Sequence, residues 1–173
     1  MVVFEMNTGK EIEIEIYPHV APITAKNFLY LCSIGFYDNT TFHRVINEFI
    51  VQGGSPNGDP MGGPGYAIKG EFKFNGISNN LKHLRGYISM ARVEDDYDSA
   101  GSQFFIILDR KNTAHLDFRY AVFGLVVRGM DVVDEIGAVA TNEEDCPIEP
   151  QTIVRVTLSE AELENAVKPD PIR

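Results

Sequence analysis

Residues 42–54 decide the fold, and they read Phe42-His43-Arg44-Val45-Ile46-Asn47-Glu48-Phe49-Ile50-Val51-Gln52-Gly53-Gly54. Two apolar, strand-like runs lie here, and each holds one long polar side chain, Arg44 in the first and Gln52 in the second. Alternate residues of a strand share a face, so Arg44 points the same way as its apolar neighbours Phe42 and Ile46. A permanent cation in an apolar wall is costly unless something uses it.

Two further aromatic runs have the same character, residues 101–108 and residues 120–124, and both are bounded by glycine. Together with residues 42–54 they predict a shallow apolar pocket with few polar groups. Arg44 also has a simpler interpretation, as a strand arginine paired with one of the many carboxylates. The aromatic runs around it favour the pocket.

Length and composition indicate one globular domain. The chain has 173 residues, of which 44% are hydrophobic, and a chain of this size buries roughly 70% of its unfolded surface. Its start has no basic region followed by a long apolar core, and no run approaches the roughly 18 apolar residues of a membrane span. We therefore expect a cytoplasmic protein with no membrane segment. Cys32 and Cys146 lie far apart and form no paired motif, which predicts reduced thiols.

The charge balance argues against one class of partner. There are 25 acidic and 15 basic residues, a formal net charge of -10. Such a chain repels phosphate backbones, so we expect no nucleic-acid binding. The same charge favours solubility, and we expect a monomer.

Periodicity predicts a mainly β protein. Ile12, Ile14 and Ile16 alternate with glutamates, which is typical of a hairpin over residues 2–17 with one wet face. Pro22 begins a helical pattern that Gly35 ends, and a second helix is expected around residues 130–136. The other expected strands, which complete a closed antiparallel barrel, are residues 41–46, 49–53, 87–91, 103–108, 121–127 and 152–158.

The last residues are expected to be separate from this barrel. Ser159-Glu160-Ala161-Glu162 has the pattern of a capping box and predicts a short helix through Val167. The domain is thus expected over residues 1–158, followed by a tail over residues 159–173.

Other chemistries find little support. The glycine-rich runs at residues 53–58 and 62–65 lack the order of a phosphate-binding loop. The acidic cluster at residues 94–98 lacks the spacing of a calcium loop, and no two histidines stand four residues apart. Gly101-Ser102-Gln103 is no nucleophile elbow. We expect no metal and no cofactor.

Residues 37–54, with Phe42-His43-Arg44, Phe49 and Gln52-Gly53-Gly54 in register, resemble the cyclophilin family of peptidyl-prolyl cis/trans isomerases. The similarity continues through residues 88–91, 99–106, 116–117 and 120–124, and covers nearly all of residues 3–158. The forms of residues 98–105 and 120–124 are closer to the prokaryotic branch. The resemblance implies an eight-stranded antiparallel barrel capped by two helices, and rotation about Xaa-Pro bonds that assists protein folding. The alternative is a proline-peptide-binding or chaperone module whose turnover is incidental.

The resemblance also implies the site. Arg44 and Gln52 are its expected catalytic residues, since Arg44 can donate to the prolyl nitrogen and Gln52 can hold Arg44 and the substrate backbone. The residues expected to bind the substrate are Phe49, Ile50, Phe105 and Leu116 around the proline ring, Ala91 and Gln103 along the peptide, and His43, His115 and Tyr120 at the border.

Three positions depart from the eukaryotic pattern. His115 replaces a tryptophan of the pocket rim, Tyr120 a histidine, and Arg92 an asparagine, at the start of an acidic loop over residues 92–100. Loss of the indole removes apolar contact and a donor, so we expect only weak binding of ciclosporin with the isomerase activity retained.

Overall fold

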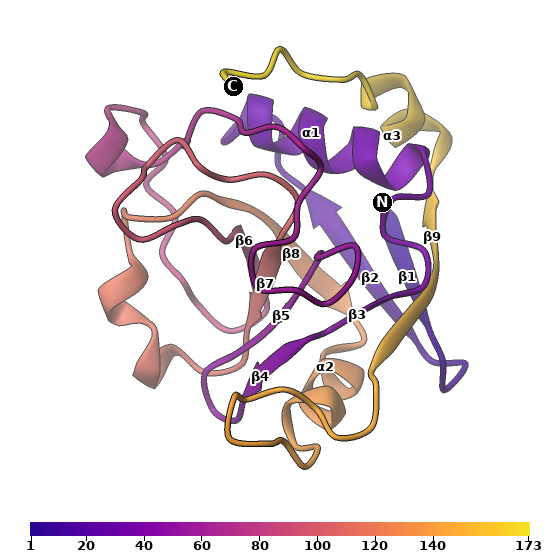
Figure 1. Ribbon diagram of the computed structural model, residues 1–173. Coiled ribbons are helices and arrows are strands. Elements are labelled where there is room, and N and C mark those ends of the chain that lie inside the picture. Colours follow the sequence, from indigo (N-terminus) through magenta and orange to yellow (C-terminus); the bar gives the residue numbers. More distant parts are fainter.

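One antiparallel sheet makes up most of the protein in the computed structural model, which describes residues 1–173 (Figure 1). Neighbouring strands follow the order β3-β9-β1-β2-β8-β6-β7-β5-β4. The strands are β1 (Val2–Met6), β2 (Glu11–Ile16), β3 (Thr40–Thr41), β4 (Arg44–Ile46), β5 (Ile50–Gly53), β6 (Tyr87–Met90), β7 (Phe104–Ile107), β8 (Val122–Arg128) and β9 (Thr152–Leu158).

The two ends of this sheet belong to one stretch of chain. At one end Thr40 and Thr41 of β3 pair with β9, and at the other end β4 pairs with β5. Only Phe42 and His43 separate β3 from β4. The sheet therefore curls round until its ends meet at residues 40–46. Counted as one strand, that stretch reduces the nine strands to eight, and the predicted closed antiparallel barrel is confirmed.

Helices cover both ends of the barrel (Figure 1). Helix α1 (Pro22–Ser33) lies at one end with α3 (Glu160–Asn165), and α2 (Met130–Gly137) lies at the other. Three short 3-10 helices occur in the loops, η1 (Lys73–Asn75), η2 (Arg110–Asn112) and η3 (Ala114–Leu116). The two capping helices agree with the prediction, and none of the helices is long and apolar enough to cross a membrane.

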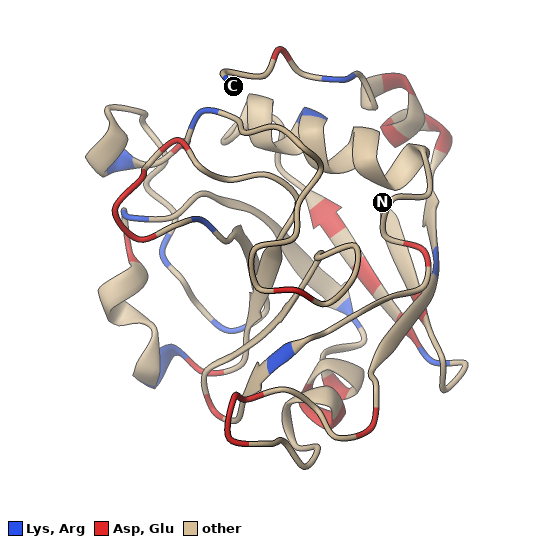
Figure 2. Cartoon of the chain, in the orientation of Figure 1, with Lys and Arg blue, Asp and Glu red and all other residues tan.

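Alternating side chains fill the barrel. Ile12, Ile14 and Ile16 are buried along β2, whereas the glutamates between them are exposed or half-buried. Phe28 from α1 packs its ring edge against Phe104 of β7, with ring centroids 5.6 Å apart. Acidic residues occur on loops, on helices and on strand β2, in several parts of the chain (Figure 2).

Helix α1 begins where Pro22 predicts, but its capping group comes from elsewhere in the chain. Ala21 offers no side-chain cap. Instead the buried carboxylate of Glu71 accepts hydrogen bonds from the backbone N–H groups of Ile23 and Thr24, at 3.1 and 2.8 Å, and from the Thr24 hydroxyl at 2.7 Å. A negative charge at this end also complements the helix dipole.

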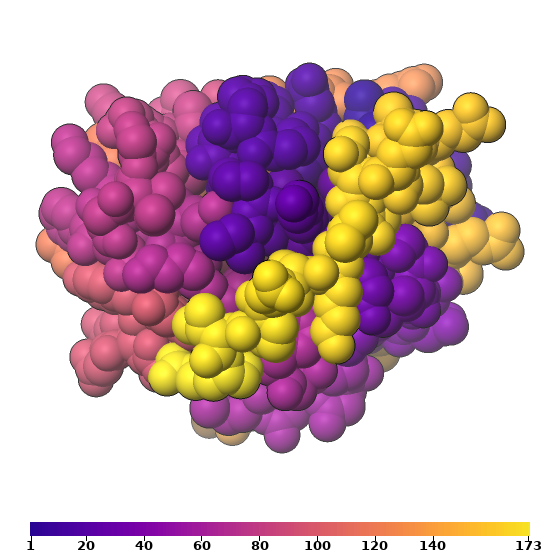
Figure 3. All heavy atoms as spheres, turned by 90° about the horizontal axis from the view of Figure 1, so that it is seen from above, coloured from indigo at the N-terminus to yellow at the C-terminus, as the bar shows by residue number.

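The tail differs in part from its prediction. Helix α3 is present but ends at Asn165, before Val167. The predicted capping box is wrong. The Ser159 hydroxyl caps no helical N–H, and it accepts a hydrogen bond from the Met1 amino group at 3.0 Å instead. The remaining residues cross the surface beside α1 as an extended band (Figure 3), with Pro169 buried against the molecule.

Candidate active site

Strand register brings the predicted polar residues into one row. Arg44 of β4 is opposite Gln52 of β5, and Gln52 is opposite Phe105 of β7. Arg44 Nη1 donates to Gln52 Oε1 at 3.2 Å, and Gln52 Nε2 donates to Gln103 Oε1 at 3.0 Å. Gln103 Nε2 in turn donates to the carbonyl oxygens of Pro60 and Gly62, at 2.9 and 2.8 Å. This series of amides holds the Arg44 guanidinium in place.

Arg44 has no carboxylate partner. Of the ion pairs within 4 Å in the structure, none includes it. The interpretation of Arg44 as half of a strand ion pair is therefore wrong. A guanidinium has five N–H donors, and the bond to Gln52 uses one of them. The others remain free for a ligand.

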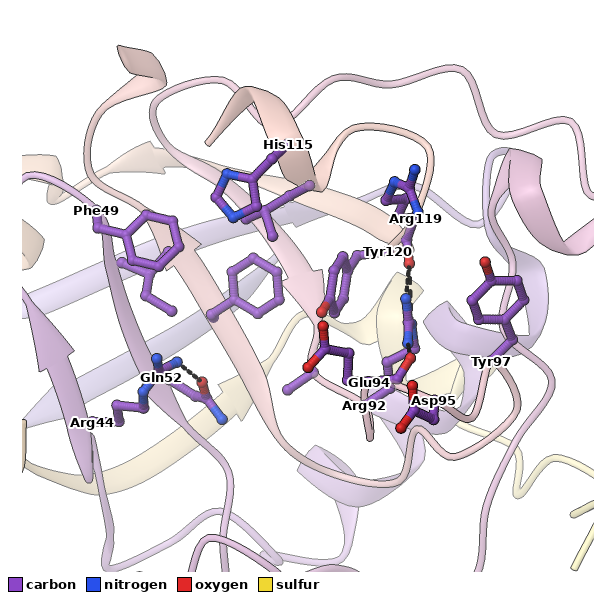
Figure 4. A pocket seen from close by; sticks show the side chains of 14 residues that line it. Arg44, Phe49, Gln52, Arg92, Glu94, Asp95, Tyr97, His115, Arg119 and Tyr120 are labelled. Carbon is purple, nitrogen blue, oxygen red and sulfur yellow. Dashed lines mark hydrogen bonds between the residues drawn. The ribbon is translucent and has the colours of Figure 1, made fainter. Parts of the chain in front are cut away.

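A cavity of about 740 Å³ opens in front of this row (Figure 4), within the size range of small-ligand sites. Nine of the eleven predicted site residues line it, namely Arg44, Phe49, Ile50, Gln52, Ala91, Phe105, His115, Leu116 and Tyr120. A neighbouring cavity of about 620 Å³ shares Gln52, Ala91 and Arg92 with the first and contains Gln103. Through these shared residues the two cavities form one groove.

The apolar part of the cavity is a small cluster apart from the main core. It consists of Ile50, Phe105, Ile107 and Leu116, against which Phe49, Tyr87, Ala91 and Tyr120 pack. Phe49 stacks on His115 with ring centroids 5.8 Å apart, and Phe105 meets Tyr120 edge to face, also at 5.8 Å. An apolar ring could enter between these walls beside the Arg44 guanidinium.

His43 lies outside both cavities. Its side chain is buried, its Nδ1 has no hydrogen-bond partner, and burial lowers its pKa from the ordinary value. The lowered pKa favours the neutral ring. Direct contact of His43 with a substrate stays a prediction.

Comparison with known proteins agrees with this geometry. Residues 1–158 match the family described as cyclophilin type peptidyl-prolyl cis-trans isomerase. The chain belongs to this cyclophilin-type family. Among curated relatives, peptidyl-prolyl cis-trans isomerase B of Escherichia coli is 44% identical over 170 residues, which cover 92% of this chain and 100% of the relative. The enzyme of the same name from Bacillus subtilis is 44% identical over 128 residues, which cover 74% of this chain and 84% of the relative.

Solved cyclophilins share the fold. A Cryptosporidium parvum cyclophilin, whose crystal structure was determined in the presence of the dipeptide Ala-Pro, superimposes with a TM-score of 0.82 at 30% identity, covering 92% of this chain and 98% of the other. The predicted family, fold and isomerase class are therefore confirmed.

Five residues that line the main cavity of this cyclophilin were not predicted: Arg92, Glu94, Asp95, Tyr97 and Arg119. Four of them belong to the acidic loop over residues 92–100. The sequence marks Arg92 as a departure, but it does not reveal what the side chain contacts. No cluster of three or more His, Cys, Asp or Glu side chains able to hold a metal ion occurs in the protein.

A buried polar cluster lies behind the Phe105 wall of the cavity, and sequence reasoning missed it. The fully buried His83 ring stacks on Phe105, with centroids 5.9 Å apart and planes 13° apart. His83 Nε2 lies 3.0 Å from the Ser89 hydroxyl, and Asp117 accepts from the His83 backbone N–H at 2.7 Å. Burial lowers the pKa of His83 from 6.5 to about 4, although the neighbouring carboxylate of Asp117 acts in the opposite direction. A neutral imidazole thus supports one wall of the cavity.

Proposed function

We propose that this protein catalyses rotation about Xaa-Pro peptide bonds, with Arg44 as the residue that acts on the twisted bond and Gln52 as the residue that holds it. The observation that carries the proposal is a guanidinium without a carboxylate partner, whose free donors face a cavity with an apolar end. A binding module needs the cavity but has no use for such a donor. Incidental turnover is therefore the less favoured function.

The chemistry of rotation suits these residues. An Xaa-Pro bond turns slowly because rotation removes amide resonance, against a barrier of roughly 20 kcal/mol. As the bond twists, the prolyl nitrogen regains a lone pair and becomes a hydrogen-bond acceptor, while the amide becomes less dipolar. Arg44 can donate to that nitrogen without losing its proton. The apolar walls favour the less dipolar form, so no covalent step or titrating base is needed.

The required reduction of the rotation barrier is larger than one hydrogen bond can supply. Reducing a time constant of about 100 s to about 1 ms takes five decades, or about 7 kcal/mol. A hydrogen bond to a charged donor contributes about 1.5–3 kcal/mol. The remainder must come from orientation of the peptide and from the apolar cavity.

We infer the substrate from the cavity walls and from the dipeptide used with the Cryptosporidium parvum relative. The proline ring fits among Phe49, Ile50, Phe105 and Leu116, which form the apolar end. His115 and Tyr120 border that end. The residues before proline would follow Ala91 and Gln103 along the second cavity. Xaa-Pro segments of unfolded or flexible proteins are then the natural substrates, and the activity assists their folding.

Several finer properties belong to the same proposal. We place the isomerase domain at residues 1–158 and treat residues 159–173 as an accessory tail packed on α1. The net charge of -10 keeps copies apart and supports a monomer. Two free cysteines support a reducing, cytoplasmic location. His115 in place of a rim indole supports weak ciclosporin binding.

A refolding experiment tests the activity. Catalytic amounts of the protein should accelerate the slow, proline-limited refolding phase of an unfolded protein substrate, and the observed rate should rise linearly with enzyme concentration. A substrate without a proline-limited phase is the control. An unchanged slow phase at equimolar protein would contradict the proposed function.

A further inference from the structure

Arg92 occupies an unusual environment in the wall between the two cavities. Its guanidinium lies over three aromatic rings, with Cζ 4.4 Å from the ring centroid of Tyr120, 4.8 Å from that of Tyr97 and 5.2 Å from that of Phe72. Each contact within about 6 Å of a ring face is attractive, because the face carries negative charge. Three rings around one guanidinium form a cage.

The hydrogen bonds of Arg92 complete this cage. Nε and Nη2 donate to the carbonyl oxygen of Arg119 at 3.0 and 2.8 Å, and Nη1 donates to those of Val93 and Glu94 at 2.9 and 2.6 Å. Four acidic residues follow within six positions, yet Arg92 forms an ion pair with none of them. An ordinary surface arginine would take such a partner, so this side chain is organised for another purpose.

The cage connects the acidic loop to the proline cavity. Tyr120 lies under the guanidinium and meets Phe105 edge to face, with ring centroids 5.8 Å apart. Phe105 is a wall of the apolar cluster, and Arg92 itself lines both cavities. In Figure 4 Arg92 stands beside Tyr120, on the side of the cavity away from Arg44 and Gln52.

We propose that Arg92 is a positioning residue, which clamps the Tyr120 ring against Phe105 and so sets the shape of the proline cavity. This inference rests on the proposed isomerase function. It assigns to the acidic loop a role at the site through its first residue, while Asp96 and Asp98 of the same loop form ion pairs with Arg173 and Lys69. Lysine cannot replace Arg92 here, because an ammonium group has no planar face to stack on a ring and no rigid pair of N–H groups that converge on one carbonyl oxygen.

The test is a double-mutant cycle on exchange between the cis and trans forms of a short Xaa-Pro peptide. Arg92→Lys keeps the charge but loses the planar contact, and Tyr120→Leu removes the ring. Contacting residues couple by about 0.5–3 kcal/mol, so we expect Arg92→Lys to lower kcat/KM by about 3- to 10-fold when Tyr120 is present. In the Tyr120→Leu background the same change should cost less than about 2-fold.

A matched control uses the other arginine of this wall. Arg119 lies over a different ring, that of Phe74, with Cζ 4.5 Å from the ring centroid, whereas the guanidinium over Tyr120 is that of Arg92. Arg119→Lys should therefore act additively with Tyr120→Leu. Ring resonances of Tyr120 and Phe105 should shift in Arg92→Lys and stay in place in Arg119→Lys, with all variants fully folded at the assay temperature.

The outcomes separate two failures. If wild-type protein accelerates exchange but Arg92→Lys acts equally in both backgrounds, or has no effect, the positioning role is wrong while the isomerase function stands. If wild-type protein does not accelerate exchange, the proposed function is wrong. The ring resonances of Arg92→Lys still test the clamp in that case, and unshifted Tyr120 and Phe105 resonances would overturn it.

Discussion

Mild acid should destabilise this protein through His83, a histidine that touches no substrate. The folded protein holds its imidazole neutral, because burial lowers its pKa from 6.5 to about 4. The unfolded chain has no such environment, so there the ring takes up a proton near pH 6.5. Between these two values the unfolded state binds one more proton than the folded state, and stability therefore rises with pH.

The magnitude follows from the difference between the two pKa values. At 1.36 kcal/mol for each pH unit, the full loss from above pH 6.5 to below pH 4 amounts to about 3 kcal/mol. Of this, about 2 kcal/mol is lost between pH 7 and pH 4.5. Carboxylates also begin to titrate near pH 4.5, so the contribution of His83 is measured against a variant that lacks the imidazole. The free energy of unfolding of a typical protein is about 5–15 kcal/mol, so a loss of this size is easily measured.

Urea unfolding followed by far-ultraviolet circular dichroism provides the assay. Wild-type protein and His83→Gln are compared at pH 7, 5.5 and 4.5, since glutamine keeps a polar contact to the Ser89 hydroxyl but cannot be charged. Wild-type protein should lose about 2 kcal/mol more than His83→Gln over this interval. Parallel stability curves for the two proteins would refute the assignment of acid sensitivity to His83.

Three further predictions concern the groove, its rim and its backbone. Gln103→Ala cuts the link from Gln52 to the carbonyls of Pro60 and Gly62, so kcat/KM in the peptide exchange assay should fall about tenfold; an unchanged value would show that Arg44 needs no such support. His115→Trp restores an indole beside Phe49, so isothermal titration should show ciclosporin binding tightened by about 3- to 10-fold; equal or weaker affinity would contradict the explanation from the rim. Gly54→Ala should lower urea stability by about 2 kcal/mol or more, because φ is +89° and a Cβ would overlap the carbonyl oxygen of Ser102. Gly58→Ala is the control, because its φ is +75° but the space around its Cβ position is open. It should lose only about 1 kcal/mol of stability. Equal losses in the two variants would show that the overlap with the Ser102 carbonyl oxygen costs nothing.

Local signals in the sequence were enough to predict the barrel and to single out Arg44 and Gln52, whereas the other site residues were predicted from the resemblance to the cyclophilin family. Alternation of Ile12, Ile14 and Ile16 with glutamates specifies a strand and its buried face, and the position of Pro22 specifies the start of α1. Arg44 and Gln52 stand out because each is a long polar residue within an apolar run. Such features depend only on near neighbours in the chain.

The missed features depend on contacts between distant segments. Glu71 caps α1 from 47 residues beyond Thr24, and His83 becomes a neutral support of Phe105 only after the barrel closes around it. The rings around Arg92 come from residues 72, 97 and 120. At the tail, the local pattern was misleading, because the Met1 amino group competes for the Ser159 hydroxyl. The local periodicity of the sequence does not indicate contacts between such distant residues.

The most direct test of the account measures exchange between the cis and trans forms of a short Ala-Pro peptide by NMR, with catalytic amounts of wild-type protein, Arg44→Ala and Arg44→Lys. A donor that acts only on the twisted bond should matter for turnover more than for affinity. We predict fast exchange with wild-type protein, a loss of about 100- to 1,000-fold with Arg44→Ala at nearly unchanged peptide affinity, and partial recovery with Arg44→Lys. Equal losses of affinity and turnover in Arg44→Ala would contradict the central claim.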